Sequence, residues 1–141
     1  MMPVSVRVTL TGDKKIKRML RNISPKKNPL IMRRALKRIG NAIRDDARLN
    51  QIIRGGGKSA PVDPKRITSR TGTGRRSIRV DSGPLPHAID VGSDLAYMAA
   101  HEEGVPARNL PARPWLEPAV NAVSAKASEI MLEEIAKAAR S

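Results

Sequence analysis

The chain has 141 residues with no cysteine, one Trp, one Tyr and no Phe, and its formal net charge is +14 at pH 7. The lack of cysteine excludes disulfide bonds and thiolate metal sites, and no apolar stretch approaches the roughly 20 residues that a membrane helix needs. The first residues lack the basic and apolar segments of a secretory signal, so we expect a cytoplasmic origin. The length suits one domain over 1–141, with a core of aliphatic side chains.

The first half of the chain contains three predicted elements. Residues 4–11 alternate apolar and polar side chains and predict a half-buried strand. Residues 13–23 place apolar side chains at helical spacing among basic ones and predict a short helix. Asn28 then caps a second helix, with Pro29 at its first position, that we expect to run to about Ile53 with a basic outer face.

A glycine-rich and basic stretch follows at about 54–76. It is too long for an ordinary connection, so we expect a flexible basic loop that is either functional or disordered in the isolated protein. Its candidate DNA-facing or partner-facing residues are Arg54, Lys58, Lys65, Arg66, Arg70, Arg75 and Arg76.

The last half predicts two short strands at 77–81 and 88–92, a brief helix at 95–102 and a proline-rich linker. From Trp115 onward, apolar residues at helical spacing predict one helix that runs almost to the C-terminus. The fold class is therefore α+β, with a small antiparallel sheet packed against a basic N-terminal helix and a long C-terminal helix.

The charge is separated along the chain. Residues 1–80 hold 22 Lys and Arg against 4 Asp and Glu, whereas residues 81–141 hold 5 against 9. This separation favours a nucleic acid or an acidic protein surface as partner. It would also let the acidic half of one copy meet the basic half of the next. The alternative is that the basic helices only keep a small domain soluble.

Two motifs that suggest catalysis are incomplete. The run Gly55-Gly56-Gly57-Lys58-Ser59 ends like a phosphate-binding loop, but Ile52 stands where that motif needs glycine. His101-Glu102 begins like a zinc-protease helix, but Val105 stands where the second His would fall. We therefore expect no enzyme and no catalytic, cofactor or metal site, with His101 in a packing or hydrogen-bonding role. Two aromatic residues cannot form a base-stacking platform, so any contact with nucleic acid would be to phosphate and independent of sequence.

Four motifs in a fixed order resemble the tail-completion and virion-morphogenesis proteins of long-tailed bacteriophages, over nearly the whole chain. The motifs are Arg70-Thr71-Gly72…Arg76-Ser77-Ile78, Val91-Gly92-Ser93, Ala96-Tyr97…His101-Glu102-x-Gly104 and Pro111-Ala112-Arg113-Pro114-Trp115-Leu116, with Trp115 in place of the usual Phe. The chain departs from this pattern by a longer glycine-rich insertion at 54–60 and by extra charge on its early helices.

The resemblance implies a virion structural protein, located in the neck or tail and assembled in the host cytoplasm. Such a protein forms a homo-oligomeric ring, expected to be a hexamer, at the head–tail junction or tail end. The ring completes the tail and joins it to the head connector. The implied partners are other copies, the connector or adaptor, the tail tube and passing genomic DNA, without a membrane. The alternative is a small basic protein that binds nucleic acid without sequence preference.

The resemblance also implies a structural or interface signature, which consists of Tyr97, His101, Glu102, Gly104, Pro111, Arg113, Pro114 and Trp115. We expect Pro111 and Pro114 to hold an extended path, and Trp115 to anchor the last helix against the sheet. Arg113 and Glu102 are expected to form an ion pair within or between subunits, the alternative being that each contacts only water.

Overall fold

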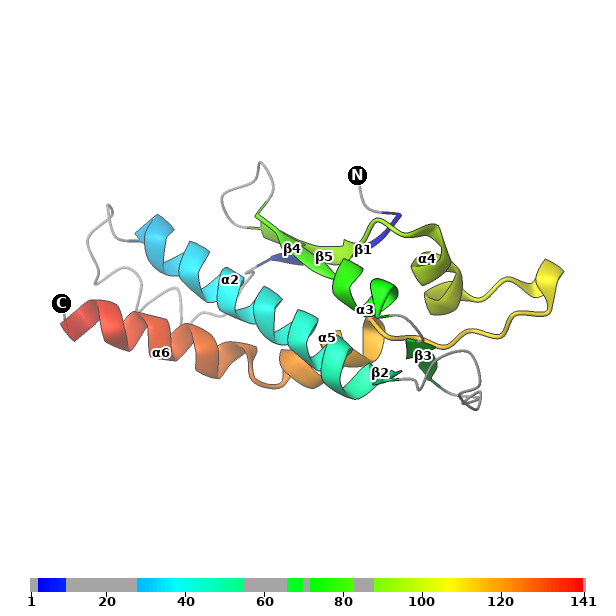
Figure 1. Ribbon diagram of the computed structural model, residues 1–141. Helices are drawn as coiled ribbons and strands as arrows, with labels where there is room; N and C mark the ends of the chain where they lie inside the picture. Colours follow the sequence, from blue (N-terminus) through cyan, green and yellow to red (C-terminus); the bar gives the residue numbers. More distant parts are fainter. Residues whose placement is uncertain (1–2, 10–27, 55–65, 70–71, 83–87, 141) are drawn as a thin grey trace.

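The computed structural model describes residues 3–9, 28–54, 66–69, 72–82 and 88–140, except the side chains of residues 28, 29, 54, 68, 69, 139 and 140. At its centre lies an antiparallel sheet with strand order β1-β5-β4 (Figure 1). The strands are β1 (Val4–Thr9), β4 (Arg79–Asp81) and β5 (Ala88–Ser93). The strand expected at 4–11 is confirmed over residues 4–9, because Val4, Val6 and Val8 face the core while the residues between them are exposed. Residues 10 and 11 lie outside the described residues.

The helix α2 (Asn28–Asp46) covers the apolar face of this sheet. The two layers meet closely at Gly40, where an added Cβ would lie 2.9 Å from Val80 Cγ1 and 3.2 Å from Ile89 Cδ1. A larger residue at this position would push the helix off the sheet, so glycine sets the spacing of the layers. The helix expected at 13–23 lies outside the described residues.

The expected end of α2 is wrong. The α-helix stops at Asp46 and continues as a π-helical turn, η1 (Ala47–Gln51), and then as the strand β2 (Ile52–Arg54). Ile52 and Ile53 pair in parallel with residues of β3 (Ile67–Ser69). The apolar stripe of α2 ends at Ala47, since Asn50 and Gln51 occupy the positions one turn later, and Ile52 then pairs with Ile67 of β3.

The continuous loop expected at 54–76 is also wrong in two places, because it contains β3 and the short helix α3 (Thr73–Ser77). Arg48 from η1 holds the end of α3, since its guanidinium donates to Arg75 O at 3.1 Å and to Ile78 O at 2.6 Å. Burial lowers the pKa of Arg48, and the nearby Arg44 and Arg75 add to this effect. Of the two predicted strands, the first is shorter than expected, because Ser77 belongs to α3.

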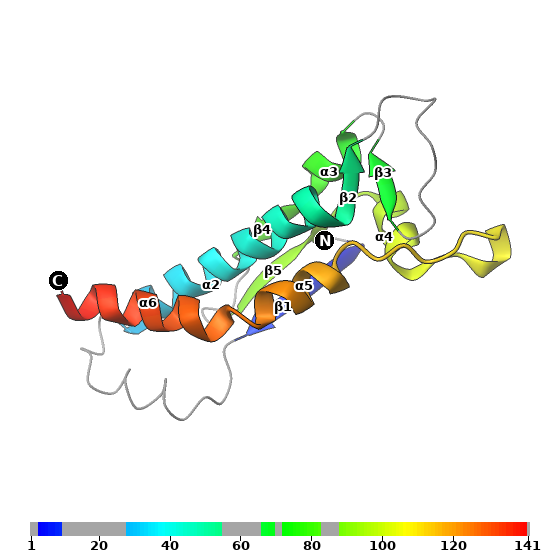
Figure 2. The ribbon, with the colours of Figure 1, turned by 90° about the horizontal axis from the view of Figure 1, so that it is seen from below.

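The C-terminal helix is two helices, α5 (Glu117–Ser124) and α6 (Ala127–Arg140), rather than one. α6 runs antiparallel beside α2 (Figure 2). Ile31 and Ala35 of α2 pack there against Met131 and Ile135. Arg38 joins the same helices through Glu133 at 2.7 Å and Glu134 at 3.0 Å. The small sheet with its surrounding helices makes an α+β fold.

Between α4 (Ala96–Glu103) and α5, the chain leaves the body and returns. We call residues 104–112 the arm. It contains a 3₁₀ turn, η2 (Pro106–Arg108), and a bridge in which the N–H of Val105 donates to Leu110 O at 2.9 Å and the N–H of Leu110 to Val105 O at 3.1 Å. The arm projects from the end of the molecule opposite the C-terminus in both ribbon views (Figures 1 and 2).

Candidate functional site

The signature residues meet where α4, the arm and α5 join. Tyr97, His101 and Glu102 lie on α4, and Arg113 to Trp115 form the segment that leads from the arm into α5. The remaining members lie in the arm: Gly104 begins it, and Pro111 stands on its returning side. We call this region the arm junction.

The Trp115 side chain fills the centre of the arm junction. It is 0% exposed and belongs to the main core, together with Val91 of the sheet and Ala119 of α5. Its indole N–H donates to Met98 O at 2.9 Å, so the buried ring nitrogen has a partner. Helix α4, the sheet and α5 are therefore packed around one aromatic ring.

Glu102, a residue of α4, caps the N-terminus of α5. Its Oε2 accepts the backbone N–H groups of Trp115 at 2.6 Å and Leu116 at 2.9 Å, and its Oε1 accepts that of Glu117 at 2.9 Å. The first N–H groups of a helix have no acceptor within the helix. The residue at the N-cap position of α5 is Leu116, whose side chain cannot accept a hydrogen bond. A carboxylate at this positive end of the helix both satisfies the donors and complements the dipole.

The ion pair expected between Glu102 and Arg113 is therefore wrong within the chain. Both carboxylate oxygens of Glu102 accept backbone N–H groups of residues 115–117, at the start of α5. Arg113 is instead fixed through its main chain, because its N–H donates to His101 O at 2.7 Å. Three backbone N–H groups at the start of a helix are a better match for one carboxylate than a single guanidinium.

His101 and Arg113 lie side by side with unsatisfied buried atoms. Nδ1 of His101 and Nε of Arg113 each lack a hydrogen-bond partner among the described residues. Burial lowers the pKa of His101, and the positive charge of Arg113 lowers it further. The ring of Tyr97 meets the imidazole edge to face, with 6.5 Å between centroids. A neutral imidazole in this position packs the junction between α4 and the segment that follows the arm.

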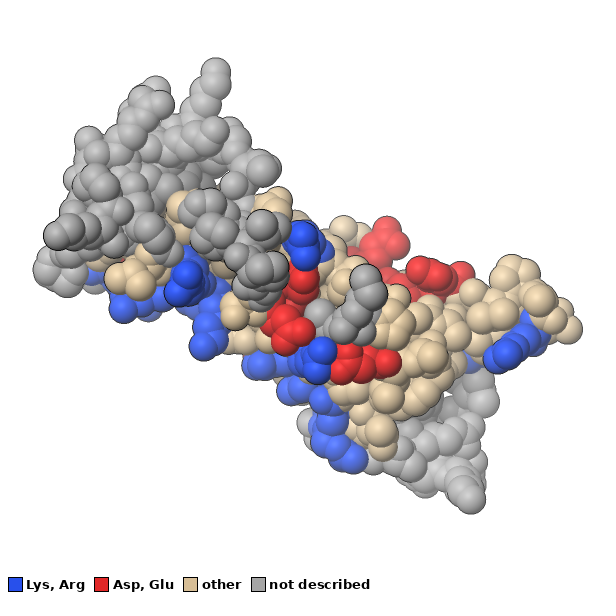
Figure 3. Space-filling model, turned by 90° about the horizontal axis from the view of Figure 1, so that it is seen from above, with Lys and Arg blue, Asp and Glu red and all other residues tan. Residues whose placement is uncertain are grey.

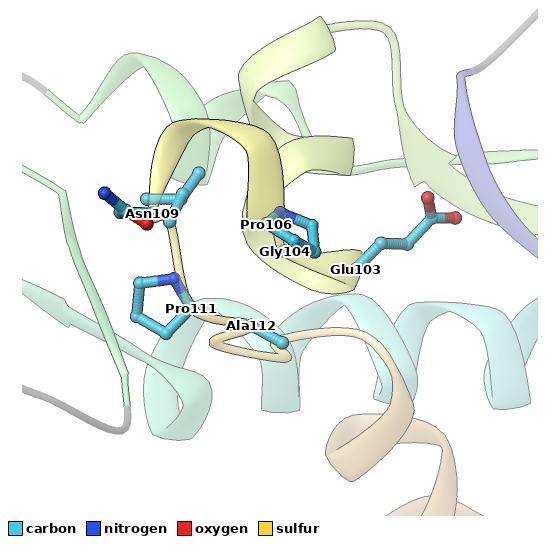
Figure 4. Close-up of a pocket in the computed structure, with 7 residues that line it drawn as sticks. Glu103, Gly104, Pro106, Asn109, Pro111 and Ala112 are labelled. Atoms are coloured by element: carbon cyan, nitrogen blue, oxygen red, sulfur yellow. The ribbon is translucent and has the colours of Figure 1, made fainter.

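Gly104 allows the arm to fold back on itself. Its φ of +76° is one that other residues rarely adopt, and an added Cβ would lie 2.8 Å from the backbone nitrogen of Ala112. Beside it, the arm carries a hollow of about 570 Å³, visible in Figure 4. Its lining residues are Glu103, Gly104, Pro106, Asn109, Leu110, Pro111 and Ala112. The hollow is thus mostly apolar, with one carboxylate at its rim.

A second contact joins two of the signature motifs and was missed from the sequence. The hydroxyls of Ser77 and Ser93 lie 2.6 Å apart, and Ser93 Oγ also accepts the N–H of Leu95 at 3.2 Å. Ser93 is fully buried. The motifs Ser77-Ile78 and Gly92-Ser93 were each recognisable, but only the packing of α3 against the end of β5 shows that their hydroxyls meet.

The structure describes the side chains of three of the seven basic candidates. Lys58, Lys65 and Arg70 lie outside the described residues, and so does the side chain of Arg54. Arg66 is exposed and donates to Asn50 O at 3.3 Å, Arg76 is exposed, and Arg75 is half-buried beside Arg48. No described contact shows what these residues bind.

A different basic surface is better defined. Leu30, Arg33, Arg34 and Lys37 of α2 are all exposed, and their spacing places them on one helical stripe, which we call the α2 stripe. None of its three cations forms an ion pair with another described residue. Figure 3 shows Lys and Arg side chains in a row along one edge of the molecule, whereas Asp and Glu lie nearer its middle and toward the arm. The sequence signal was the i, i+3, i+4, i+7 spacing.

Within the part of the chain that the structure describes, no three His, Asp or Glu side chains are close enough to hold a metal ion. No described helix is long and apolar enough to cross a membrane. No family model, curated protein or solved structure matches the chain.

Proposed function

We propose that this chain is a structural subunit of a long-tailed phage or prophage virion. It forms a ring at the head–tail junction or the tail end, completes the tail and joins it to the head connector. The proposal starts from the order of the sequence motifs. The observation that supports it best is the arm junction, where the motif residues lie together and hold the projecting arm in place.

The chemistry of the arm junction supports a structural role for the motifs. Glu102 uses its carboxylate to cap α5, Trp115 fills the core, and Gly104 permits the close return of the arm. These interactions fix an arm whose own residues are largely exposed. A rigid exposed projection is suited to contact with another molecule, because it loses little conformational entropy on binding.

The charge of the chain is consistent with a place beside DNA. A net charge of +14 on 141 residues attracts phosphate without reading sequence. In a ring, this positive charge would attract, weakly and without sequence preference, the genomic DNA that passes through the lumen. The other partners in this proposal are the connector or adaptor and the tail tube, and the location is the neck or tail of the virion.

The α2 stripe favours a second candidate, a small basic protein that binds nucleic acid away from the virion. Its three cations form no ion pair with a described residue, so the phosphates of a nucleic acid could serve as their counter-charges. Ring assembly with weak DNA contact favours the virion subunit. Tight binding by a monomer, with affinity falling steeply as salt rises, favours the second candidate.

A complementation experiment tests the proposal. Deleting the gene from the phage or prophage that carries it should leave DNA-filled heads and separate tails, because each branch is built before the two join. Purified protein added to that lysate should restore joined particles, more readily at low salt than at high salt. Normal joined virions from the deletion strain would rule the assignment out.

A further inference from the structure

Two exposed surfaces of the subunit each present apolar area to water. On α2, the side chain of Leu30 is 51% exposed and stands on the same helical stripe as Arg33, Arg34 and Lys37. On the arm, the hollow is lined by prolines, Leu110 and Ala112. The exposed leucine and the apolar hollow each leave apolar surface in contact with water. Contact between them would bury that surface, which is favourable.

The charges around these two surfaces are complementary. The leucine is flanked by three cations, and the rim of the hollow carries Glu103, whose side chain points away from the prolines (Figure 4). Glu117 lies close by, because its backbone N–H is bound to the carboxylate of Glu102, the residue before Glu103. Glu103 and Glu117 are both exposed, and neither forms an ion pair with a described residue.

The two surfaces cannot meet within one chain. The N-terminal part of α2 and the arm lie at opposite ends of the molecule in both ribbon views (Figures 1 and 2). Two different patches at opposite ends give a head-to-tail contact, which closes into a ring if the rotation between copies permits it.

We infer that the α2 stripe of one copy docks on the arm of the next, with Leu30 in the arm hollow and the stripe cations against Glu103 and Glu117. This inference rests on the proposed ring function and specifies its subunit contact. The occupant of the arm hollow is a second copy of this chain.

A charge-exchange experiment tests the contact. The stripe variant is Arg33→Glu with Arg34→Glu, and the arm variant is Glu103→Lys with Glu117→Lys. The controls are Lys126→Glu and Glu129→Lys, each of which reverses one exposed charge outside both surfaces. Leu30→Gln tests the apolar contact without a change of charge. The full-length proteins are compared at low salt by native mass spectrometry and light scattering, after circular dichroism has checked that each is folded.

The wild type and both controls should associate. Each charge variant alone should need at least a roughly tenfold higher concentration, because like charges then face each other. Leu30→Gln should weaken association in the same direction. A one-to-one mixture of the two charge variants should restore association, since every contact then pairs opposite charges. An alternating ring closes with an even number of copies.

Several results would overturn the inference. If both variants associate like the wild type, if only one of them is impaired, or if mixing restores nothing, the contact lies elsewhere and the proposed ring function stands. If the stripe variant loses binding to a random DNA duplex but still associates normally, the stripe is a DNA surface. If the wild type itself stays monomeric at every salt and protein concentration, the ring function fails together with this inference.

Discussion

Glu102 and Trp115 are joined by a 2.6 Å hydrogen bond from the backbone N–H of Trp115 to Oε2 of Glu102. The indole of the same Trp115 donates to Met98 O, one helical turn earlier on α4. Helix α4 therefore holds both the main chain and the side chain of this residue. The two contacts fix the direction in which α5 begins and the point to which the arm returns.

The first prediction concerns the cap. Glu102→Ala leaves three backbone N–H groups at the start of α5 without their acceptor, so we expect a loss of about 1–3 kcal/mol in the free energy of unfolding. Urea denaturation measures it. Glu103→Ala, at the exposed neighbouring position, is the control and should change stability by no more than about 0.5 kcal/mol. Equal effects of the two substitutions would contradict the capping role.

The second prediction concerns the core of the arm junction. Trp115→Ala should cost about 3–5 kcal/mol, as large aromatic truncations in cores do. Trp115→Phe keeps an aromatic ring but leaves Met98 O without its donor, so its cost should be smaller and close to 1–3 kcal/mol. Thermal unfolding checks both variants. A melting temperature that moves by only a degree or two in Trp115→Ala would show that the ring is not a core anchor.

The third prediction concerns the sheet. A Cβ added at Gly92 would overlap Val4 O and lie 2.7 Å from Ser5 Cα, both of the neighbouring strand β1. Gly92→Ala must therefore separate β1 from β5, and we expect a loss of at least about 1–3 kcal/mol. Thr9→Ala, at the exposed end of β1, is the control. Wild-type stability in Gly92→Ala would show that the two strands are not paired in this register.

The fourth prediction concerns pH. Burial beside Arg113 lowers the pKa of His101 in the folded protein, whereas an unfolded histidine titrates near about 6.5. The unfolded state therefore binds more protons below that pH, and stability should fall as the pH drops from about 6.5 through the folded-state pKa. His101→Gln should flatten this part of the stability curve, measured by urea denaturation between pH 5 and 8. Identical curves for the two proteins would contradict the prediction. The comparison also separates His101 from His87, which lies outside the described residues.

Much of the fold could be predicted from local patterns. The alternation of Val4, Val6 and Val8 gave β1, and the Asn28-Pro29 pair gave the start of α2. The end of α2 was placed too late in the chain, because no glycine or proline stands between residues 41 and 54, and Ile52 and Ile53 form a strand only through pairing with β3. The break between α5 and α6 falls at Ala125 and Lys126, where no glycine or proline marks it.

The arm junction was harder to predict than the fold. The burial of Trp115 follows from the scarcity of aromatic residues in a chain that needs a core. The partner of Glu102 could not be predicted from the sequence. The motif offers Arg113 as the nearest opposite charge, but the Glu102 carboxylate accepts hydrogen bonds from backbone N–H groups, which carry no sequence signal. Likewise, the hydroxyls of Ser77 and Ser93 meet only through tertiary packing.

A reconstruction of the neck of the virion, from the phage or prophage that carries this gene, tests the central claim most directly. The proposal predicts a ring of this chain at the head–tail junction or the tail end, with copies in contact head to tail and DNA in the lumen. A neck and tail end whose density is filled by other proteins, in virions that contain no peptide of this chain, would contradict it.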